Sequence, residues 1–260
     1  FDRAYLGYWR HFKDAAIVRA VPRRAITGVR CNLKWVGGGG LPPSSALINA
    51  LRCFDAVNVP SRILYDIFRY RHPAVFYTPH GVDETIFSPG VRTPSSAGKL
   101  VLGWAGSLSN HPGKRGLDDF LLPALEGLTG VELKLAARER GMRNQAEMVE
   151  FYRGLDALIC TSRTEGGPHP LLEAAACGLP LISTPVGLAP QLITHAENGL
   201  IIERDNAAIR RAVTTLRDQR DFRAAMGRRA RATIEQAWTW DMQASAYIDF
   251  FEHGLAQSVF

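Results

Sequence analysis

Short apolar runs alternate with amphipathic stretches from about residue 99 onward. Short, nearly continuous apolar runs predict strands buried on both faces, and apolar positions at helical spacing predict the helices that cover them. The predicted strands are Lys99–Trp104, Val131–Ala137, Ala157–Thr161, Pro180–Thr184 and Leu200–Glu203, and the predicted helices are Leu117–Leu128, Gln145–Arg153, Leu171–Cys177 and Ala207–Leu216. This order predicts a doubly wound α/β domain whose ligand lies at the carboxyl ends of parallel strands.

Residues 1–90 show the same alternation less regularly. The predicted strands here are Ala25–Val29, Asp55–Val59 and Ala74–Thr78, and the predicted helices are Ser45–Arg52 and one that Ser61 caps. Residues 88–98 are rich in Pro, Ser and Gly and predict a linker. We expect a partial N-terminal α/β domain over residues 1–90, a second domain over 91–237 and a closing helix over 238–260.

The composition, with 46% apolar and 22% charged residues, is that of a globular protein. No apolar run approaches the roughly 20 residues that span a bilayer. The cysteines Cys31, Cys53, Cys160 and Cys177 lack the spacing of a zinc or redox motif, which predicts a reducing, cytoplasmic location. Phe1 is not an initiator Met, and no signal peptide follows it, so we expect the chain to begin inside a longer one.

The net charge of +6 favours anionic partners such as phosphorylated ligands or an acidic membrane surface, although a solvated basic surface explains it equally well. Part of the charge comes from arginines that we expect on one helical segment: Arg220, Arg223, Arg228, Arg229 and Arg231. The chain has no zinc finger or RNP-type signature, so nucleic acid is not an expected partner.

The segment from Ser162 to Gly199 carries the strongest chemical signal. Seven residues separate Glu165, in a Gly/Pro loop after a predicted strand, from Glu173, near the start of a helix. Glycines let backbone N–H groups approach a ligand, and a helix start favours a phosphate. Carboxylates beside such a site can accept hydrogen bonds from sugar hydroxyls. From the residues alone, Glu173 could equally complement the helix dipole and the glycines could simply form a turn.

The stretch EGGPHPLLEAAACG resembles the signature of the retaining GT-B glycosyltransferases (glycosyl transferases group 1), usually E-G-F-G-x-P-x-x-E-A-M-A-C-G. LPLISTPVGLAPQLI and ENGLII resemble the elements that follow it. The resemblance implies a GT-B fold and metal-independent transfer, with retention, of a hexose-like sugar from a UDP- or GDP-type donor. The implied acceptor is a saccharide or lipid-linked hydroxyl, in polysaccharide or glycolipid synthesis. The alternative is a GT-B module that binds without catalysis.

The resemblance also implies roles for individual residues. Glu165 would hold the donor-sugar hydroxyls and Glu173 the ribose. Backbone N–H groups near Gly106 and the Gly167 loop would bind phosphate and sugar oxygens. The implied catalytic residues are Glu165, Arg115 and Lys114, and the implied donor-binding residues are Gly106, Ser107, Gly167, Pro168, His169, Leu171 and Glu173.

LGWAGSLSNHPGKRGLDDF resembles the element that grips the donor diphosphate in this family. A fixed cation there lowers the barrier because the leaving group gathers negative charge. Arg115 aligns best with the family's Lys, and Lys114 is the alternative; without the family, both would be a solvated pair. Ser107 stands where the family usually has a second cation.

Two further stretches resemble the family. TPHGVDETIFSP resembles its interdomain segment, with His80 in place of Asn, and His80 could also be a plain turn residue. WTWDMQASAYIDFF resembles the closing helix that packs on the N-terminal domain. The histidine that the family carries in that domain has no match, and the nearest candidate strand offers Arg30 instead. A complete acceptor-side domain in this family needs clearly more than the ninety residues present here, so the N-terminal domain is expected to be incomplete.

Overall fold

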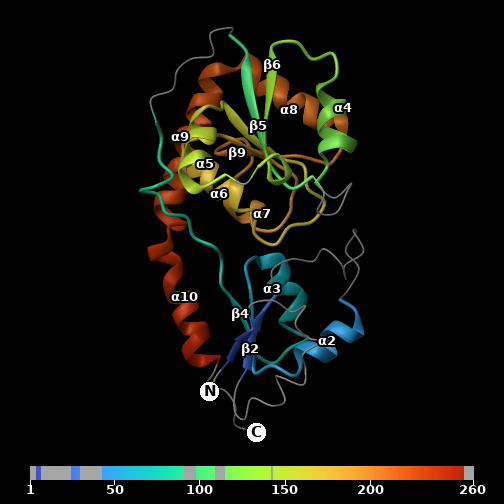
Figure 1. Cartoon of the computed structure of the whole chain (residues 1–260), viewed down its shortest axis with the longest axis vertical. Helices are drawn as coiled ribbons and strands as arrows, with labels where there is room; N and C mark the ends of the chain where they lie inside the picture. Colours follow the sequence, from blue (N-terminus) through green and yellow to red (C-terminus); the bar gives the residue numbers. More distant parts are fainter. Residues whose placement is uncertain are drawn as a thin grey trace. The chain divides into compact units, whose positions relative to one another are not determined.

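The chain forms two compact units, each with its own parallel sheet (Figure 1). The structure, a computed structural model, describes residues 4–6, 25–29, 43–90, 98–108, 115–141 and 143–254. The first unit contains residues 1–80, 164–167 and 241–260, and the second contains residues 81–163 and 168–240.

The sheet of the second unit has five parallel strands in the order β6-β5-β7-β8-β9. Their bounds are β5 Leu100–Gly106, β6 Val131–Ala137, β7 Ala157–Cys160, β8 Leu181–Ser183 and β9 Gly199–Ile201. The predicted parallel sheet is therefore confirmed. β5 lies between β6 and β7, so that Leu102 pairs with both Leu133 and Ala157.

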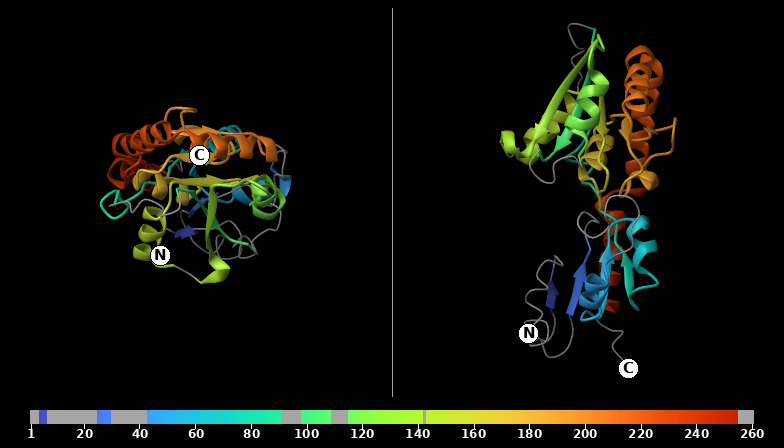
Figure 2. Two further views of the ribbon diagram at one scale, coloured as in Figure 1. Left: turned by 90° about the horizontal axis from the view of Figure 1, so that it is seen from above. Right: turned by 90° about the vertical axis from the view of Figure 1, so that its right-hand side faces the viewer.

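Helices flank this sheet on both faces (Figure 2). They are α4 Leu122–Leu125, α5 Gln145–Arg153, α6 His169–Ala176, α7 Ala189–Leu192, α8 Asn206–Asp218 and α9 Arg220–Ala237, with a π-helical turn η2 Leu117–Leu121 and a 3-10 turn η3 Arg138–Arg140. Successive strand residues point to opposite faces. Leu158 accordingly packs with α5, α6 and α9, whereas Ile159 packs with η2, α4 and α8. The domain is doubly wound, as predicted.

Two predicted helices in this unit have different bounds. The helix predicted over Leu117–Leu128 ends with α4 at Leu125, and Gly127 follows with a φ of 68° that a continuing helix cannot adopt. Helix α6 begins at His169, two residues before the predicted start, because Pro170 is compatible with a first helical turn. Short β1 and α7 were not predicted.

The first unit has four parallel strands in the order β1-β2-β3-β4, which confirms an α/β fold for this part. The bounds are β1 Ala4–Leu6, β2 Ala25–Gly28, β3 Ala56–Val59 and β4 Val75–Tyr77, with helices α2 Ser45–Leu51 and α3 Arg62–Phe68. Ser61 caps α3 as predicted, because its hydroxyl accepts a hydrogen bond from the N–H of Leu64 at 3.4 Å. Helix α10, Trp240–His253, adds the fully buried Phe250 to a cluster with Ile26, Ala56 and Ala74.

The cysteines behave as small apolar residues where they are described. Cys177 is buried, Cys160 is partly buried and Cys53 is exposed, and Cys31 lies outside the described residues. Among the described residues, no helix is both long enough and apolar enough to cross a membrane.

Helix α9 packs against α6 and the turn that follows it through Gly227. A Cβ atom on Gly227 would lie 2.4 Å from the carbonyl oxygen of Gly178 and 3.2 Å from Cδ of Pro180. Because Gly227 has no side chain, the two segments can approach closely. This close packing holds the carboxyl end of α6 in place.

We predict that Gly227→Ala destabilises the chain. Alanine favours a helix over glycine by about 1 kcal/mol. The contact with the Gly178 carbonyl forces the helices apart, and overpacking of this kind costs about 1–3 kcal/mol. Denaturant unfolding should therefore show a net loss of stability. Arg228→Ala, at the next and exposed position of α9, is the control, and equal stabilities for the two variants would contradict the prediction.

Candidate functional site

The carboxyl ends of the second unit's strands meet at one edge of the sheet because the strands are all parallel. Gly106 and Ser107 close β5, Glu139 follows β6, Arg163 follows β7 and Arg204 follows β9. Residues far apart in the sequence are thus brought to one edge. We call this edge, with these residues and the turn at Gly116, the carboxyl edge.

A left-handed turn at Gly116 fixes the segment that contains Arg115. Gly116 has a φ of 71°, and a Cβ atom there would lie 2.4 Å from the carbonyl oxygen of Thr161. Only glycine tolerates both conditions. The Thr161 hydroxyl also donates a hydrogen bond to the carbonyl oxygen of Arg115 at 2.8 Å. The backbone of Arg115 is therefore pinned against the end of β7, where the sequence predicted a cation. Lys114 lies outside the described residues.

Arg204 reaches this turn from the end of β9. Its Nε donates to the carbonyl oxygen of Thr161 at 3.0 Å, and its guanidinium carbon lies 4.1 Å from the centroid of the Phe120 ring. The built Cβ position on Gly116 is 3.2 Å from Nη2 of Arg204. Hydrogen bonding and stacking together hold this partly buried guanidinium in one orientation.

Arg204 is affected by burial and by charges of both signs nearby. Burial lowers the pKa of the Arg204 guanidinium, the positive charge of Arg163 lowers it further, and Asp119 acts in the opposite direction. Neither Arg163 nor Arg204 was predicted from the sequence. The signal that was available is their position directly after the predicted strands that end at Thr161 and Glu203, which places cations at the ligand-binding edge of a parallel sheet.

Ser107, by contrast, faces an acid. Its hydroxyl donates to Oε1 of Glu139 at 2.5 Å, and the N–H of Leu108 donates to Oε2 of the same carboxylate at 2.8 Å. Gly106 allows Trp104 to lie close by, since a Cβ atom on Gly106 would be 2.8 Å from the indole. The carboxylate of Glu139 thus occupies the corner after β5, where Gly106 and Ser107 were predicted to bind the donor.

Glu173, on helix α6, is partly buried. Oε2 of Glu173 accepts a hydrogen bond of 2.6 Å from the hydroxyl of Tyr152 on α5. Burial raises the pKa of the Glu173 carboxyl, and the Tyr152 hydrogen bond partly offsets that increase. Burial and the Glu173 charge raise the pKa of the Tyr152 phenol well above its usual value. Tyr152, which was not predicted from the sequence, therefore fixes the orientation of Glu173.

The other predicted residues at the start of α6 differ in exposure. Pro168 is buried at the N-cap position, His169 is exposed, and the Leu171 side chain is fully buried in the core. Leu171 can therefore offer only backbone atoms to a ligand, and its N–H already donates to the carbonyl oxygen of Pro168.

Glu165 and Gly167 lie in the loop between β7 and α6, within the segment Thr164–Gly167 that groups with the first unit. Glu165 is partly buried. Next to it, the buried hydroxyl of Thr164 has no hydrogen-bond partner among the described residues. Buried polar groups are nearly always hydrogen-bonded, so this hydroxyl is suited to a ligand that enters the loop. The role of Glu165 stays a prediction.

His80, in the first unit, has a side-chain neighbour. The Tyr247 hydroxyl lies 3.3 Å from Nδ1 of His80 and 3.2 Å from the carbonyl oxygen of Thr78. This contact ties the strand end after β4 to α10. Arg30 lies outside the described residues.

Two of the α9 arginines, Arg223 and Arg231, make contacts within the second unit. Nη1 of Arg231 donates to the carbonyl oxygens of Glu84, Phe87 and Ala176. Arg223 pairs with Asp156 at 3.6 Å. All five cluster residues lie on α9, as predicted.

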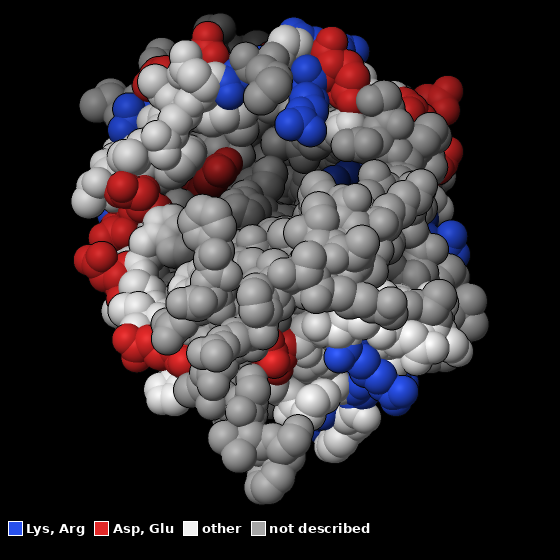
Figure 3. All heavy atoms as spheres, turned by 60° about the horizontal axis from the view of Figure 1, so that its bottom comes forward, with Lys and Arg blue, Asp and Glu red and all other residues white. Residues whose placement is uncertain are grey.

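On the face of the molecule shown in Figure 3, basic and acidic side chains are interspersed.

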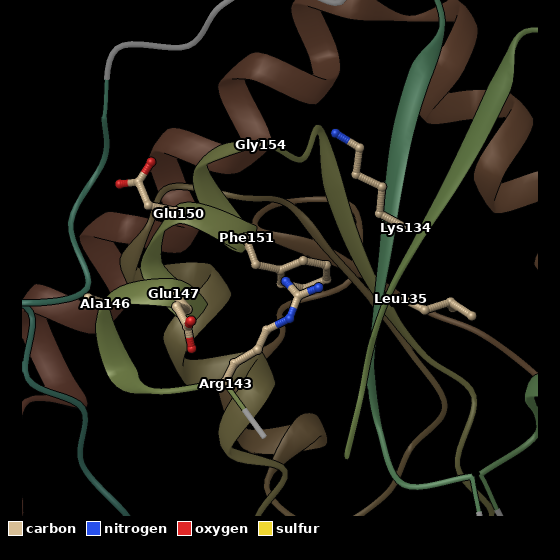
Figure 4. A pocket seen from close by; sticks show the side chains of 8 residues that line it. All are labelled: Lys134, Leu135, Arg143, Ala146, Glu147, Glu150, Phe151 and Gly154. Atoms are coloured by element: carbon tan, nitrogen blue, oxygen red, sulfur yellow. The ribbon is translucent and has the colours of Figure 1, made fainter. Parts of the chain in front are cut away.

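A hollow of about 780 Å³ lies elsewhere in the second unit, beside β6 and α5 (Figure 4). It contains none of the predicted site residues, and Arg143 lies across it over the ring of Phe151 at 4.9 Å. The lining residues are Lys134, Leu135, Arg143, Ala146, Glu147, Glu150, Phe151 and Gly154. Within the described part of the chain, no group of three or more His, Cys, Asp or Glu side chains could hold a metal ion.

Comparison with known proteins bears on this site. Residues 140–233, which include α6 and Arg204, match the family model described as "Glycosyl transferases group 1". A D-inositol 3-phosphate glycosyltransferase from Arthrobacter sp. (strain FB24) is 28% identical over 213 residues, which cover 70% of this chain and 50% of that protein. The chain spans about half the length of the curated relatives it matches over most of its length.

Solved structures show the fold. A sucrose-phosphate synthase from Thermosynechococcus elongatus superposes with a TM-score of 0.83 at 15% identity, over 99% of this chain and 75% of that one. Anabaena Alr3699/HepE in complex with UDP and glucose gives a TM-score of 0.75 at 16% identity, over 97% of this chain and 78% of that one. The expected GT-B fold class is thereby confirmed.

We predict that Glu173→Gln changes the pH dependence of stability. The pKa of Glu173 is raised in the folded chain, so the stabilisation present below its ordinary value of 4.5 is lost as the pH rises through the raised pKa. Glutamine mimics the protonated carboxyl and does not titrate. As the pH rises from 4 to 7, the free energy of unfolding of the variant should therefore increase relative to that of the unsubstituted chain.

Denaturant unfolding at several pH values measures this difference. Glu197→Gln, at an exposed turn residue, is the control for the removal of one charge. A Glu173→Gln difference that stays constant with pH, or falls as the pH rises, would show that burial does not govern this carboxyl.

Proposed function

Since the chain belongs, through its residues 140–233, to the group 1 glycosyltransferases, we propose that it transfers a hexose-like sugar, with retention, from a nucleoside-diphosphate sugar to a hydroxyl acceptor. The observation that carries this proposal is the carboxyl edge. There a left-handed turn pins the backbone of Arg115 against the end of β7, and Arg204 is fixed beside the same turn. A site of this kind suits an anionic leaving group.

The electrostatics of the reaction explain why such an edge is needed. As the bond from the sugar to the diphosphate breaks, negative charge gathers on the phosphate oxygens. Cations that are already oriented stabilise this charge without reorganisation in the transition state. Arg115, helped by Lys114, is the residue that the family resemblance assigns to this role.

The two glutamates have different tasks in this proposal. Glu173 would accept hydrogen bonds from the ribose hydroxyls, since Tyr152 already fixes its carboxylate. Glu165, in the loop before α6, would hold the hydroxyls of the donor sugar. Backbone N–H groups near Gly167 and His169 would bind phosphate or sugar oxygens. Two carboxylates flanking the anomeric carbon, as in retaining glycosidases, are a different arrangement that we do not assign here.

Donor and acceptor are proposed by class. A UDP- or GDP-type donor agrees with the UDP and glucose bound by Alr3699/HepE. A saccharide, inositol-type or lipid-linked hydroxyl agrees with the D-inositol 3-phosphate named for the Arthrobacter relative. A lipid-linked acceptor would bring the chain to an acidic membrane surface, which its net charge of +6 favours. Comparing transfer to vesicle-bound and soluble acceptors separates the two classes.

We predict that Glu173→Ala weakens nucleotide binding, whereas Glu165→Ala mainly lowers turnover. A hydrogen bond to a charged group is worth about 1.5–3 kcal/mol, so each loss should be roughly 10- to 150-fold. Calorimetric titration with UDP, GDP and ADP measures the first effect. Transfer or donor hydrolysis measures the second. Thermal unfolding of both variants checks that they fold, and Glu197→Ala serves as the surface control.

The outcomes separate the candidate functions. Saturable binding of one nucleotide that Glu173→Ala weakens supports the donor site and identifies the base. Binding without transfer or hydrolysis favours the non-catalytic module. Equal affinities and equal rates in both variants would falsify the two assignments.

We also predict that removing metal ions leaves the activity unchanged, because the cations at the carboxyl edge are arginine side chains. The rate should be the same, within error, in excess EDTA and in added Mg²⁺ or Mn²⁺. An activity that EDTA abolishes and a divalent cation restores would contradict this part of the proposal.

A further inference from the structure

Strand β6 is the outermost strand on one side of the five-stranded sheet, so only one of its two sides pairs with β5. The carbonyl oxygen of Gly130 accepts a hydrogen bond of 2.9 Å from the N–H of Leu100, at the start of β5. Backbone groups of alternate residues point to opposite sides of a strand, so those of Val131, Leu133 and Leu135 point away from β5. Among the described residues, no strand pairs with them. Such an edge can accept another strand.

The helices of the second unit leave space on both faces of this edge. On the α5 face, the hollow of about 780 Å³ lies beside Lys134 (Figure 4). On the α4 face, a second hollow of about 500 Å³ is lined in part by Leu133 and by Leu122, which is 44% exposed. Side chains of an added strand can therefore be received on either face of the sheet.

The sequence of β6 is complementary to itself when it is reversed. Two antiparallel copies that place Leu133 opposite Leu133 also place Val131 opposite Leu135, and Glu132 opposite Lys134. Residues whose backbone groups point outward then face one another, as hydrogen-bonded pairs require. Apolar side chains meet apolar ones on the α4 face, and each acid meets a base on the α5 face.

This register is the favourable one among its neighbours. Charged side chains on an edge strand normally oppose further pairing. A slide of two residues in one direction would put Glu132 opposite Glu132, and a slide in the other direction would put Lys134 opposite Lys134. Like charges directly opposite one another destabilise a strand pair. The charges therefore select one register and exclude the two nearest alternatives.

The two charged side chains are suited to a partner across the strands. Within β6, Nζ of Lys134 lies 4.0 Å from Oε1 of Glu132, and the side chains are 45% and 48% exposed, so this pair contributes little by itself. Residues two apart on a strand are separated by about 7 Å, whereas directly opposite Cα atoms in a pair without hydrogen bonds are about 4.5 Å apart. The acids in the same hollow are already engaged, because Glu147 accepts a backbone hydrogen bond at the start of α5 and Glu150 pairs with Arg153.

We propose that β6 pairs antiparallel with β6 of a second copy of this chain, with Leu133 beside the two-fold axis. The two five-stranded sheets then form one continuous sheet. A second copy is the partner that fits, because a two-fold axis presents the same strand in reverse and so supplies the matching order of charges. The pairing uses no residue of the carboxyl edge, and it therefore goes beyond the proposed function.

Charge reversal tests this interface by analytical ultracentrifugation over a concentration series. Lys134→Glu and Glu132→Lys each put like charges opposite one another at both symmetric positions, so each should weaken dimerisation roughly 10-fold or more. An equimolar mixture of the two variants should dimerise again. One partner then supplies two acids and the other two bases, so that every cross-strand pair is again of opposite charge.

Asp66→Lys and Arg69→Glu are the matched controls, since these residues form an exposed ion pair on α3, in the first unit. Each should leave the dimer unchanged, alone and in the mixture. The proposal is overturned if the unsubstituted chain stays monomeric up to roughly 0.1 mM. It is also overturned by a dimer that neither β6 variant weakens, or by a mixture of the β6 variants that dimerises no better than each variant alone.

Discussion

The parallel pairing of the five strands in the second unit is the constraint on which the rest depends. Parallel strands deliver all their carboxyl ends to one edge, so loops separated by up to a hundred residues of sequence meet there. The pairing requires crossover helices on both faces, and these bury the apolar runs that hold the ladder together. The backbone hydrogen bonding that holds the parallel sheet together therefore also determines which side chains meet at this edge.

Helix α6 shows how the core and the site are coupled. Tyr152 on α5 orients Glu173 in the middle of the helix, and Gly227 on α9 lets the turn after the helix pack closely. Arg231 satisfies the carbonyl of Ala176, one of the acceptors that a helix end leaves unpaired. Three neighbouring contacts therefore fix the middle and the carboxyl end of the segment that resembles the family signature.

Local patterns predicted the elements well where apolar periodicity was strong. The bounds of β6 and α5 agree with prediction residue for residue, because a buried run and a capped helix are both encoded locally. Glu173 was predicted to be a donor-binding residue from its spacing to Glu165 and from the family resemblance. Its partner Tyr152, the Glu139 carboxylate beside Ser107 and the stacking of Arg204 on Phe120 were not, since each joins side chains from separate strands or helices. Such pairings follow from tertiary packing, which no short window of sequence contains.

The charges at the two outer corners of the carboxyl edge have a consequence for the local field. Glu139 follows the outermost strand on one side of the sheet, and Arg204 follows the outermost strand on the other. Each has neighbours of the opposite sign, because Arg138 and Arg140 flank Glu139, and Glu203 and Asp205 flank Arg204. The fields of the two corners therefore largely cancel at a distance, and a charged molecule is oriented by individual side chains only once it is in contact with the edge.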